Sequence, residues 1–428
     1  MKEVIEFTHY QSKNQLDLFV CNNPKFKTNL IQLFIIEPLS AAKASKTALV
    51  PFVLYRGSQK FPSRRDLKIR LDQLYGADLT ISVTKRGENQ ILGFTLEVVN
   101  EEFLPEKEPL LEQGMKLLFE IIFNPLFAEG FVEQEKDFLK QDIVSLINDK
   151  YSYSIQRCYQ EMCKQEPFGV FKLGEVDELE KINQGVLYRY YQEMINSSYM
   201  ALFVIGDLAE ERVAEQLEQI FSFRHRQPSL ANNTTVVSAV NQTKEIIEEL
   251  NVRQGKLCLG FRTAITRGDS AYYPLLFYNG ILGSFPHSKL FQNVREKEGL
   301  AYYADSYLES TKGLLMITSG IDFPNYERAR EIILLQVEQI KQGQITDNEY
   351  QWTKKALLNR YRSVADANKA LSSHYLLGLI NHKTESIDQF MKELEQVTKE
   401  EIIEVAQKIQ LDTIYFLKKE EGKDATGN

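Results

Sequence analysis

The sequence contains few residues of the kinds that mark several common protein classes. Its 428 residues include only four cysteines and five histidines. Four cysteines do not make a disulfide framework in a chain of this length, so we expect reduced, buried thiols. The 51 lysines and arginines are outnumbered by 59 acidic residues, which gives a formal net charge of −8. The basic surface typical of nucleic-acid-binding proteins is therefore not expected.

Long hydrophobic runs are also missing. The strongest early apolar run, Leu33–Ile36, is far shorter than the roughly 20 residues of a membrane-spanning helix. Glu3 and Glu6 interrupt the region where a signal peptide needs an apolar core, so we expect a cytoplasmic protein. The composition is 43% apolar and 26% charged, as in globular proteins. The length exceeds what one hydrophobic core usually organises, which predicts at least two domains.

The pattern of apolar residues predicts two copies of one helix-and-sheet unit. In the first half it predicts strands at 15–21, 29–36, 80–83, 92–99 and 201–206, and helices ending at 56 and spanning 110–123 and 131–147. The second half repeats the central part of this order, with a helix at 288–297, strands at 300–308 and 313–321, and helices at 329–342 and from 346 onward. Thr346 and Glu349 have the spacing of a capping box at the start of the last of these helices.

Two glycines mark the duplication. Gly76 and Gly299 each follow a helix and precede a strand pair, and 299 − 76 = 223 residues separate them. Short polar turns between consecutive strands indicate antiparallel pairing, with helices packed on one face, which is an α+β fold class. The uncharged segment around 227–242 is the best linker candidate. We therefore expect homologous domains at 1–225 and 245–428, joined by a linker at 226–244.

The segment ILGSFPHSKLFQNVREKEGLAYYADS, residues 281–306, resembles the second-domain signature of the insulinase/pitrilysin metallopeptidases, the inverzincin family that includes the mitochondrial processing peptidases. The resemblance implies a sheet of about six strands in each domain and a clamshell that closes over a peptide. It also implies a zinc motif, H-x-x-E-H, on a helix of the first domain.

That zinc motif is absent from this sequence. Aligning the helix end of the family with residues 55–58 places its three functional positions at Ala48, Pro51 and Phe52. None of these side chains can bind Zn²⁺, and Pro51 cannot act as a general base. Pro51 also removes a helix N–H group and is expected to kink the helix. We expect no metal site and no cofactor in this chain.

Two acidic residues on the predicted helix 131–147 correspond to acidic positions of the family. Glu135 matches one of them, and Asp142 lies where the family has its third zinc ligand. The two residues are two helical turns apart, on a face that also carries Phe138, Leu139 and Leu146. The alternative interpretation is that both acids flank an apolar stripe and are solvated or paired with lysines.

Arg295 and Tyr302 match a second functional feature of the family. In active members an arginine and a tyrosine from the second half contact the peptide beside the zinc ion. A fixed cation and a phenol can stabilise the negative charge that develops on a tetrahedral oxygen. Otherwise, Arg295 would only interact with the C-terminal end of its own helix, and Tyr302 would be a core aromatic residue.

The resemblance therefore implies a non-catalytic subunit of a heterodimeric zinc metallopeptidase. Its partner would be a homologue with H-x-x-E-H that holds the zinc ion. This chain would bind an extended peptide and supply Arg295 and Tyr302 to the partner's active site. The alternative is a peptide-binding or scaffold protein of the same fold with no role in proteolysis. In isolation the chain could also form a homodimer.

Overall fold

The computed structural model describes residues 5–12, 15–221, 226, 228 and 234–420, which form two compact units. Described residues within 1–144, 170–233 and 364–376 form unit 1, and those within 145–169, 234–363 and 377–428 form unit 2. The domain limits expected from the sequence, 1–225 and 245–428, stay a prediction. Part of the expected linker, 226–244, lies outside the described residues.

Unit 1 is built on a six-stranded sheet with the order β1-β2-β6-β3-β5-β4. Its strands are β1 (Thr8–Gln11), β2 (Asp17–Asn22), β3 (Thr28–Pro38), β4 (Asp78–Arg86), β5 (Asn89–Val99) and β6 (Tyr199–Gly206). Neighbouring strands are antiparallel except β2 and β6, which run parallel. The strands expected from alternating apolar residues are all present.

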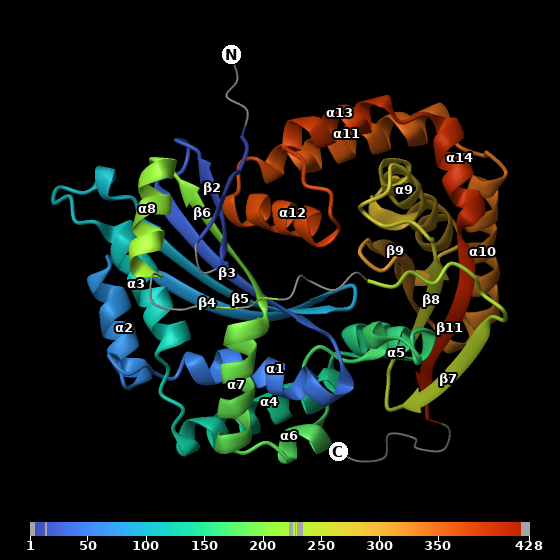
Figure 1. Ribbon diagram of the computed structural model, residues 1–428. Helices are drawn as coiled ribbons and strands as arrows, with labels where there is room; N and C mark the ends of the chain where they lie inside the picture. Colours follow the sequence, from blue (N-terminus) through green and yellow to red (C-terminus); the bar gives the residue numbers. More distant parts are fainter. Residues whose placement is uncertain (1–4, 13–14, 222–225, 227, 229–233, 421–428) are drawn as a thin grey trace. The chain divides into compact units, whose positions relative to one another are not determined.

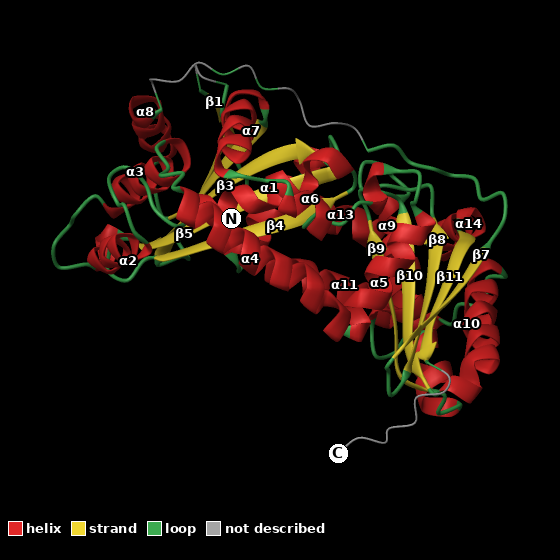
Figure 2. Ribbon diagram, turned by 90° about the horizontal axis from the view of Figure 1, so that it is seen from below, coloured by secondary structure: helices red, strands yellow, loops and turns green. Residues whose placement is uncertain are grey.

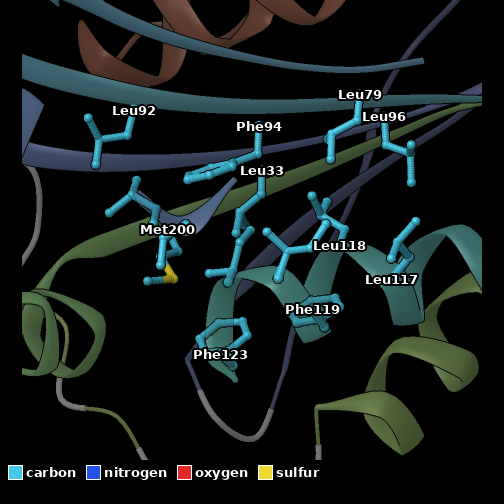
Figure 3. Close-up of a cluster of buried hydrophobic side chains, with 14 of the residues drawn as sticks. Leu33, Leu79, Leu92, Phe94, Leu96, Leu117, Leu118, Phe119, Phe123 and Met200 are labelled. Carbon is cyan, nitrogen blue, oxygen red and sulfur yellow. The ribbon is translucent and has the colours of Figure 1, made fainter. Parts of the chain in front are cut away.

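The helices of unit 1 pack their apolar sides on one face of this sheet (Figure 1). They are α1 (Ala41–Leu54), α2 (Arg64–Gln73), α3 (Leu110–Phe123), α4 (Glu129–Ser145), α6 (Val176–Glu180), α7 (Gln184–Ser197) and α8 (Glu210–Ile220), with a short 3-10 turn η1 (Glu101–Phe103). Figure 3 shows Leu118 and Phe119 of α3 facing Leu33 and Phe94 of the sheet. This buried layer is the core of unit 1.

Unit 2 is built on a five-stranded sheet with the order β7-β11-β8-β10-β9 (Figure 2). Its strands are β7 (Lys244–Leu250), β8 (Gly255–Arg262), β9 (Ala301–Glu309), β10 (Leu314–Ile321) and β11 (Gln410–Lys419). All neighbours are antiparallel except β7 and β11. Among the described residues β9 pairs only with β10, so its outer edge is open.

Helical segments also cover one face of the second sheet. They are α9 (Tyr272–Asn279), α10 (Tyr326–Lys341), α11 (Asp347–Val364), α13 (Ile387–Gln396), α14 (Lys399–Lys408) and two π-helical segments, η4 (Gly280–Ser284) and η5 (Phe291–Lys297). The capping box at the start of α11 is confirmed, because Glu349 N–H donates to Thr346 Oγ1 and Thr346 N–H donates to the Glu349 carboxylate. The remaining short turns are η2 (Leu146–Asn148), η3 (Pro167–Gly169) and η6 (Phe323–Asn325).

The two units share one topology. Strands β2-β6-β3-β5-β4 correspond to β7-β11-β8-β10-β9, and the single parallel pair occupies the same place in both sheets. Gly76 and Gly299 have positive φ angles of 74° and 62°, and each precedes a strand by two residues. Glycine adopts this left-handed conformation without steric cost. The expected α+β class with two homologous units is confirmed.

The second face of each sheet is covered by a segment from a distant part of the chain. In unit 1, Tyr375 of α12 (Asn368–Ile380) packs against Phe19 and Phe203, with ring centroids 5.3 and 6.0 Å apart. In unit 2, α5 (Lys150–Met162) covers the other face of the sheet. A Cβ atom at Gly260 would lie 2.7 Å from Met162 Sδ, so α5 can approach β8 closely only over a glycine.

All four cysteines are buried and free, which confirms the expected thiols. No helix in the described part of the chain combines the length and the apolar character needed to cross a membrane.

Candidate functional site

The three positions that align with the zinc motif lie on α1. Its alanine-rich sequence favours a helix, and the helix continues to Leu54 although Pro51 lies inside it. Ala48 and Pro51 are buried, and Phe52 is half-buried against the core of unit 1. These hydrocarbon groups do not fit a zinc ion, which binds imidazole, thiolate or carboxylate ligands.

The N-terminal half of α1 is fixed by the chain segment around Gly174. The Ser45 hydroxyl donates to the Glu175 carbonyl over 3.2 Å and accepts from its N–H over 3.1 Å. A Cβ atom at Gly174 would lie 2.0 Å from Ser45 Oγ, so the backbone approaches the helix as closely as glycine permits. Gly174 has a φ of 76°, which also favours glycine. This part of α1 is therefore covered by protein.

The acidic residues of α4 occupy two different environments. Glu135 is 8% exposed and forms an ion pair with Arg56, which follows the end of α1. Asp142 is exposed on the same helix. Phe138 is 54% exposed whereas its neighbour Leu139 is buried, so the expected apolar stripe is only partly covered by the core. The pairing of Glu135 is with an arginine and not with lysines, because Arg56 extends from the end of α1 toward α4.

No metal centre emerges from the arrangement of donor groups. Within the residues that the structure describes, no three or more His, Cys, Asp or Glu side chains come together in a way that could hold an ion. The Glu135 carboxylate of α4 is already paired with Arg56. The three positions on α1 therefore offer no side chain that could bind zinc or act as its general base.

Arg295 lies in the last turn of η5, beside the open edge of the second sheet. The expected helix at 288–297 is present, but its last seven residues form a π-helix. Such segments are rare and occur frequently at functional sites. The Arg295 guanidinium lies 4.6 Å from the centre of the Phe291 ring, and its Nε is 3.6 Å from Glu296 Oε1. Its side chain is 42% exposed, which leaves donors free.

Tyr302 lies at a β-bulge in β9. Tyr303 is opposite Gly320 and Ala301 is opposite Ile321, so Tyr302 is the extra residue between two ladder pairs. Bulges re-aim side chains and are common at sheet edges and beside active sites. Tyr302 is 78% exposed, which contradicts the alternative that it is a core aromatic residue. Because η5 packs on β9, the structure brings Tyr302 and Arg295 to neighbouring elements.

Sequence reasoning missed the groups that surround this pair. Tyr303 points to the face covered by α5, where it packs edge-to-face with Tyr151 at 5.4 Å. Lys256 Nζ lies 5.3 Å from the centre of the Tyr303 ring. Asp305, two residues further along β9, has a pKa that burial raises and the charge of Arg295 partly lowers. Alternation along the strand could have placed Asp305 on the same face of β9 as Tyr303. Nothing in the local sequence predicts that Tyr151 packs against Tyr303.

Comparisons with known proteins agree with this architecture. Residues 181–357 match the family described as "Peptidase M16 inactive domain". The chain is 40% identical over 412 residues to the Bacillus subtilis (strain 168) protein named "Probable inactive metalloprotease YmfF", covering 95% of this chain and 96% of that protein. A crystal structure of a conserved protein from Enterococcus faecalis V583 matches with a TM-score of 0.89 and 31% identity, over 98% of this chain and 100% of that chain. A crystal structure of a peptidase M16 inactive domain from Pseudomonas fluorescens matches with a TM-score of 0.80 over 98% of this chain and 99% of that chain, and at 15% identity it shows a common fold alone.

Proposed function

Because this chain belongs to the M16 peptidase family, we propose that it is the zinc-free, non-catalytic subunit of a heterodimeric zinc metallopeptidase. One contrast carries the proposal. The first half has hydrocarbon at all three positions of the zinc motif, Ala48, Pro51 and Phe52. The second half keeps an exposed arginine and an exposed tyrosine beside an open strand edge. A chain of this kind can assist an active site but cannot form one alone.

The open edge of β9 suits an extended peptide. Its outer backbone N–H and C=O groups have no strand partner among the described residues, and an added peptide strand would satisfy them. The bulge at Tyr302 interrupts the regular ladder and turns the phenol outward. A peptide bound along β9 would therefore pass the phenol of Tyr302.

In this proposal Arg295 and Tyr302 act on the peptide in trans. The partner subunit would hold the zinc ion that activates the attacking water. Arg295 would donate N–H groups, and Tyr302 its O–H group, to the scissile carbonyl oxygen as negative charge develops on it. Arginine keeps its positive charge at any working pH, so this contribution needs no proton transfer.

The partner that the chemistry requires is a homologue with an intact H-x-x-E-H helix. Such a protein would supply the ligands and the general base that this chain lacks. The isolated chain could also pair with a second copy of itself, which would contain no zinc motif. We propose that the complex is cytoplasmic, where the four buried, free cysteines would stay reduced.

Reconstitution tests this proposal. The purified chain is mixed with the H-x-x-E-H homologue of the same organism, and hydrolysis of short fluorogenic peptides is compared with that of each protein alone. We expect activity from the mixture, and zinc in the partner only. Arg295→Ala should lower the kcat of the mixture by about a hundredfold, and Tyr302→Phe by about tenfold or more.

Matched variants separate function from folding. Arg328→Ala removes another exposed arginine of unit 2, whose side chain is 57% exposed, and should leave activity unchanged. Tyr188→Phe does the same for an exposed tyrosine of unit 1. Full activity of both the Arg295 and Tyr302 variants would contradict the role in trans. Peptide binding without hydrolysis in any mixture would favour the second candidate, a peptide-binding or scaffold protein, which the open edge of β9 also supports.

A further inference from the structure

The guanidinium of Arg295 is restrained on one side and free on the other. Its Cζ lies 4.6 Å from the centre of the Phe291 ring, one helical turn earlier. Its Nε lies 3.6 Å from Glu296 Oε1, and the positive charge of Arg295 also acts on Asp305 of the neighbouring strand. The two terminal nitrogens of the guanidinium are not used by these contacts. Arg295 is thus held at its ring plane and at Nε, while its fork of N–H donors stays available.

Phe291 is not part of the buried core of unit 2. Its side chain is half-buried, whereas the next core residue of the same segment, Val294, is fully buried. Residues four apart in a helical segment lie on one side of it, which explains why the ring and the guanidinium meet. The half-buried ring of Phe291 is thus the surface on which the Arg295 guanidinium stacks.

We propose that Phe291 is a positioning residue, which holds the Arg295 guanidinium by ring stacking in the orientation that reaches a peptide carbonyl at the edge of β9. This inference rests on the proposed function and extends it to a residue that touches no substrate. An arginine side chain loses rotamer entropy when it is fixed on binding. A stacked ring removes part of that loss before the transition state forms, so the benefit falls on kcat.

The test uses the reconstituted complex and a double-mutant cycle. Phe291→Leu removes the aromatic face and keeps a hydrophobic side chain, and Phe291→Tyr keeps the face. We expect Phe291→Leu to lower kcat by about three- to tenfold, as loss of one cation–π contact implies, with KM changed less than about twofold. Phe291→Tyr should restore kcat. In the Arg295→Ala background, Phe291→Leu should have no further effect, because its action passes through Arg295.

The outcomes distinguish this inference from the proposed function. If Arg295→Ala leaves activity intact, both are wrong. If Arg295→Ala impairs catalysis but Phe291→Leu does not, only the positioning role is wrong. An equal effect of Phe291→Leu with and without Arg295 would assign Phe291 a structural role and overturn the inference. Melting temperatures of all variants identify a loss caused by unfolding, and a variant that melts early is replaced by Phe291→Met in the same cycle.

Discussion

Arg56, which follows the end of α1, forms an ion pair with the buried carboxylate of Glu135 on α4. The same guanidinium lies 5.6 Å from the centre of the Phe138 ring. This contact joins the helix that carries the zinc motif in the family to the helix that carries its third ligand. In this chain the two helices are therefore connected by an ion pair and a ring contact instead of a metal ion.

Removing Arg56 should destabilise unit 1. Arg56→Ala leaves the Glu135 carboxylate buried without its cation, and we expect the free energy of unfolding to fall by about 3 kcal/mol. Urea denaturation followed by far-UV circular dichroism measures this change. Lys140→Ala breaks an exposed pair with Glu180 and serves as the matched control, with an expected loss below about 1 kcal/mol. Equal losses in the two variants would show that the buried Arg56–Glu135 pair stabilises unit 1 no more than an exposed ion pair does.

Restoring the family motif should not create a zinc enzyme. The triple variant A48H/P51E/F52H supplies the motif residues, but Ala48 is fully buried and an imidazole there overpacks the core. Glu135 of α4 is paired with Arg56, and Asp142, at the position of the family's third ligand, is exposed and has a shorter side chain than glutamate. We expect less than about 0.1 zinc ion per chain by elemental analysis, and a lower melting temperature.

A single variant separates the effect of Pro51 on helix α1 from the effect of the introduced zinc ligands. Pro51→Ala alone returns an amide donor to the interior of α1 and should not lower the melting temperature. Stoichiometric zinc in the triple variant, together with peptide hydrolysis by the isolated chain, would refute the view that packing has closed this site.

Local patterns predicted most of the elements. Alternating apolar residues identified strands such as β5, and helical spacing identified α3 at its observed limits, Leu110–Phe123. The equivalence of Gly76 and Gly299 was predictable, because a positive φ before a strand is a backbone requirement that only glycine meets without strain. The loss of the zinc ligands could also be predicted from the sequence, because it depends only on the side-chain chemistry at three positions.

Non-local features were not predictable from one sequence. The placement of α5 on the second sheet depends on contacts such as Met162 with Gly260, about a hundred residues apart in the chain. The exposure of Phe138 follows from which face of α4 meets the core, and a face that mixes apolar and acidic residues leaves this choice to tertiary packing. The bulge at Tyr302 adds one residue to a ladder, and no local composition marks it.

The buried charges around Glu166 should make unit 2 sensitive to acid. Glu166 lies 2.6 Å from Arg262 and 2.6 Å from Lys312. Burial alone would raise the pKa of the Glu166 carboxyl, but the hydrogen bonds and charges of these two cations outweigh burial and lower it from its ordinary value of 4.5. A lowered pKa stabilises the folded state above about pH 4.5, and this stabilisation is lost as the pH falls through the pKa of the folded protein.

Glu166→Gln tests this linkage. At pH 7 the substitution removes the carboxylate that two buried cations share, and we expect a loss of about 3 kcal/mol in unfolding free energy. Below about pH 4.5 the difference from the unsubstituted protein should shrink, because its carboxyl becomes protonated as the pH falls through the lowered pKa of the folded protein. Urea titrations at pH 7, 4.5 and 3 measure this. A difference that stays constant over this range would mean that Glu166 acts only through packing.

The neighbours Tyr302 and Tyr303 should respond in opposite ways to the same truncation. Tyr302 is 78% exposed, so Tyr302→Ala should change the free energy of unfolding by less than about 0.5 kcal/mol. Tyr303 packs against Tyr151 at 5.4 Å and lies 5.3 Å from Lys256 Nζ, so Tyr303→Ala should cost about 2 kcal/mol. Thermal denaturation of both variants measures the contrast. In the reconstituted complex the order should reverse, and Tyr302→Ala should lower kcat more than Tyr303→Ala does. The reason is that the outward phenol of Tyr302 contributes to peptide binding at β9 and not to the folding of the strand. A large loss of stability in Tyr302→Ala would place that side chain in the core and remove it from the site.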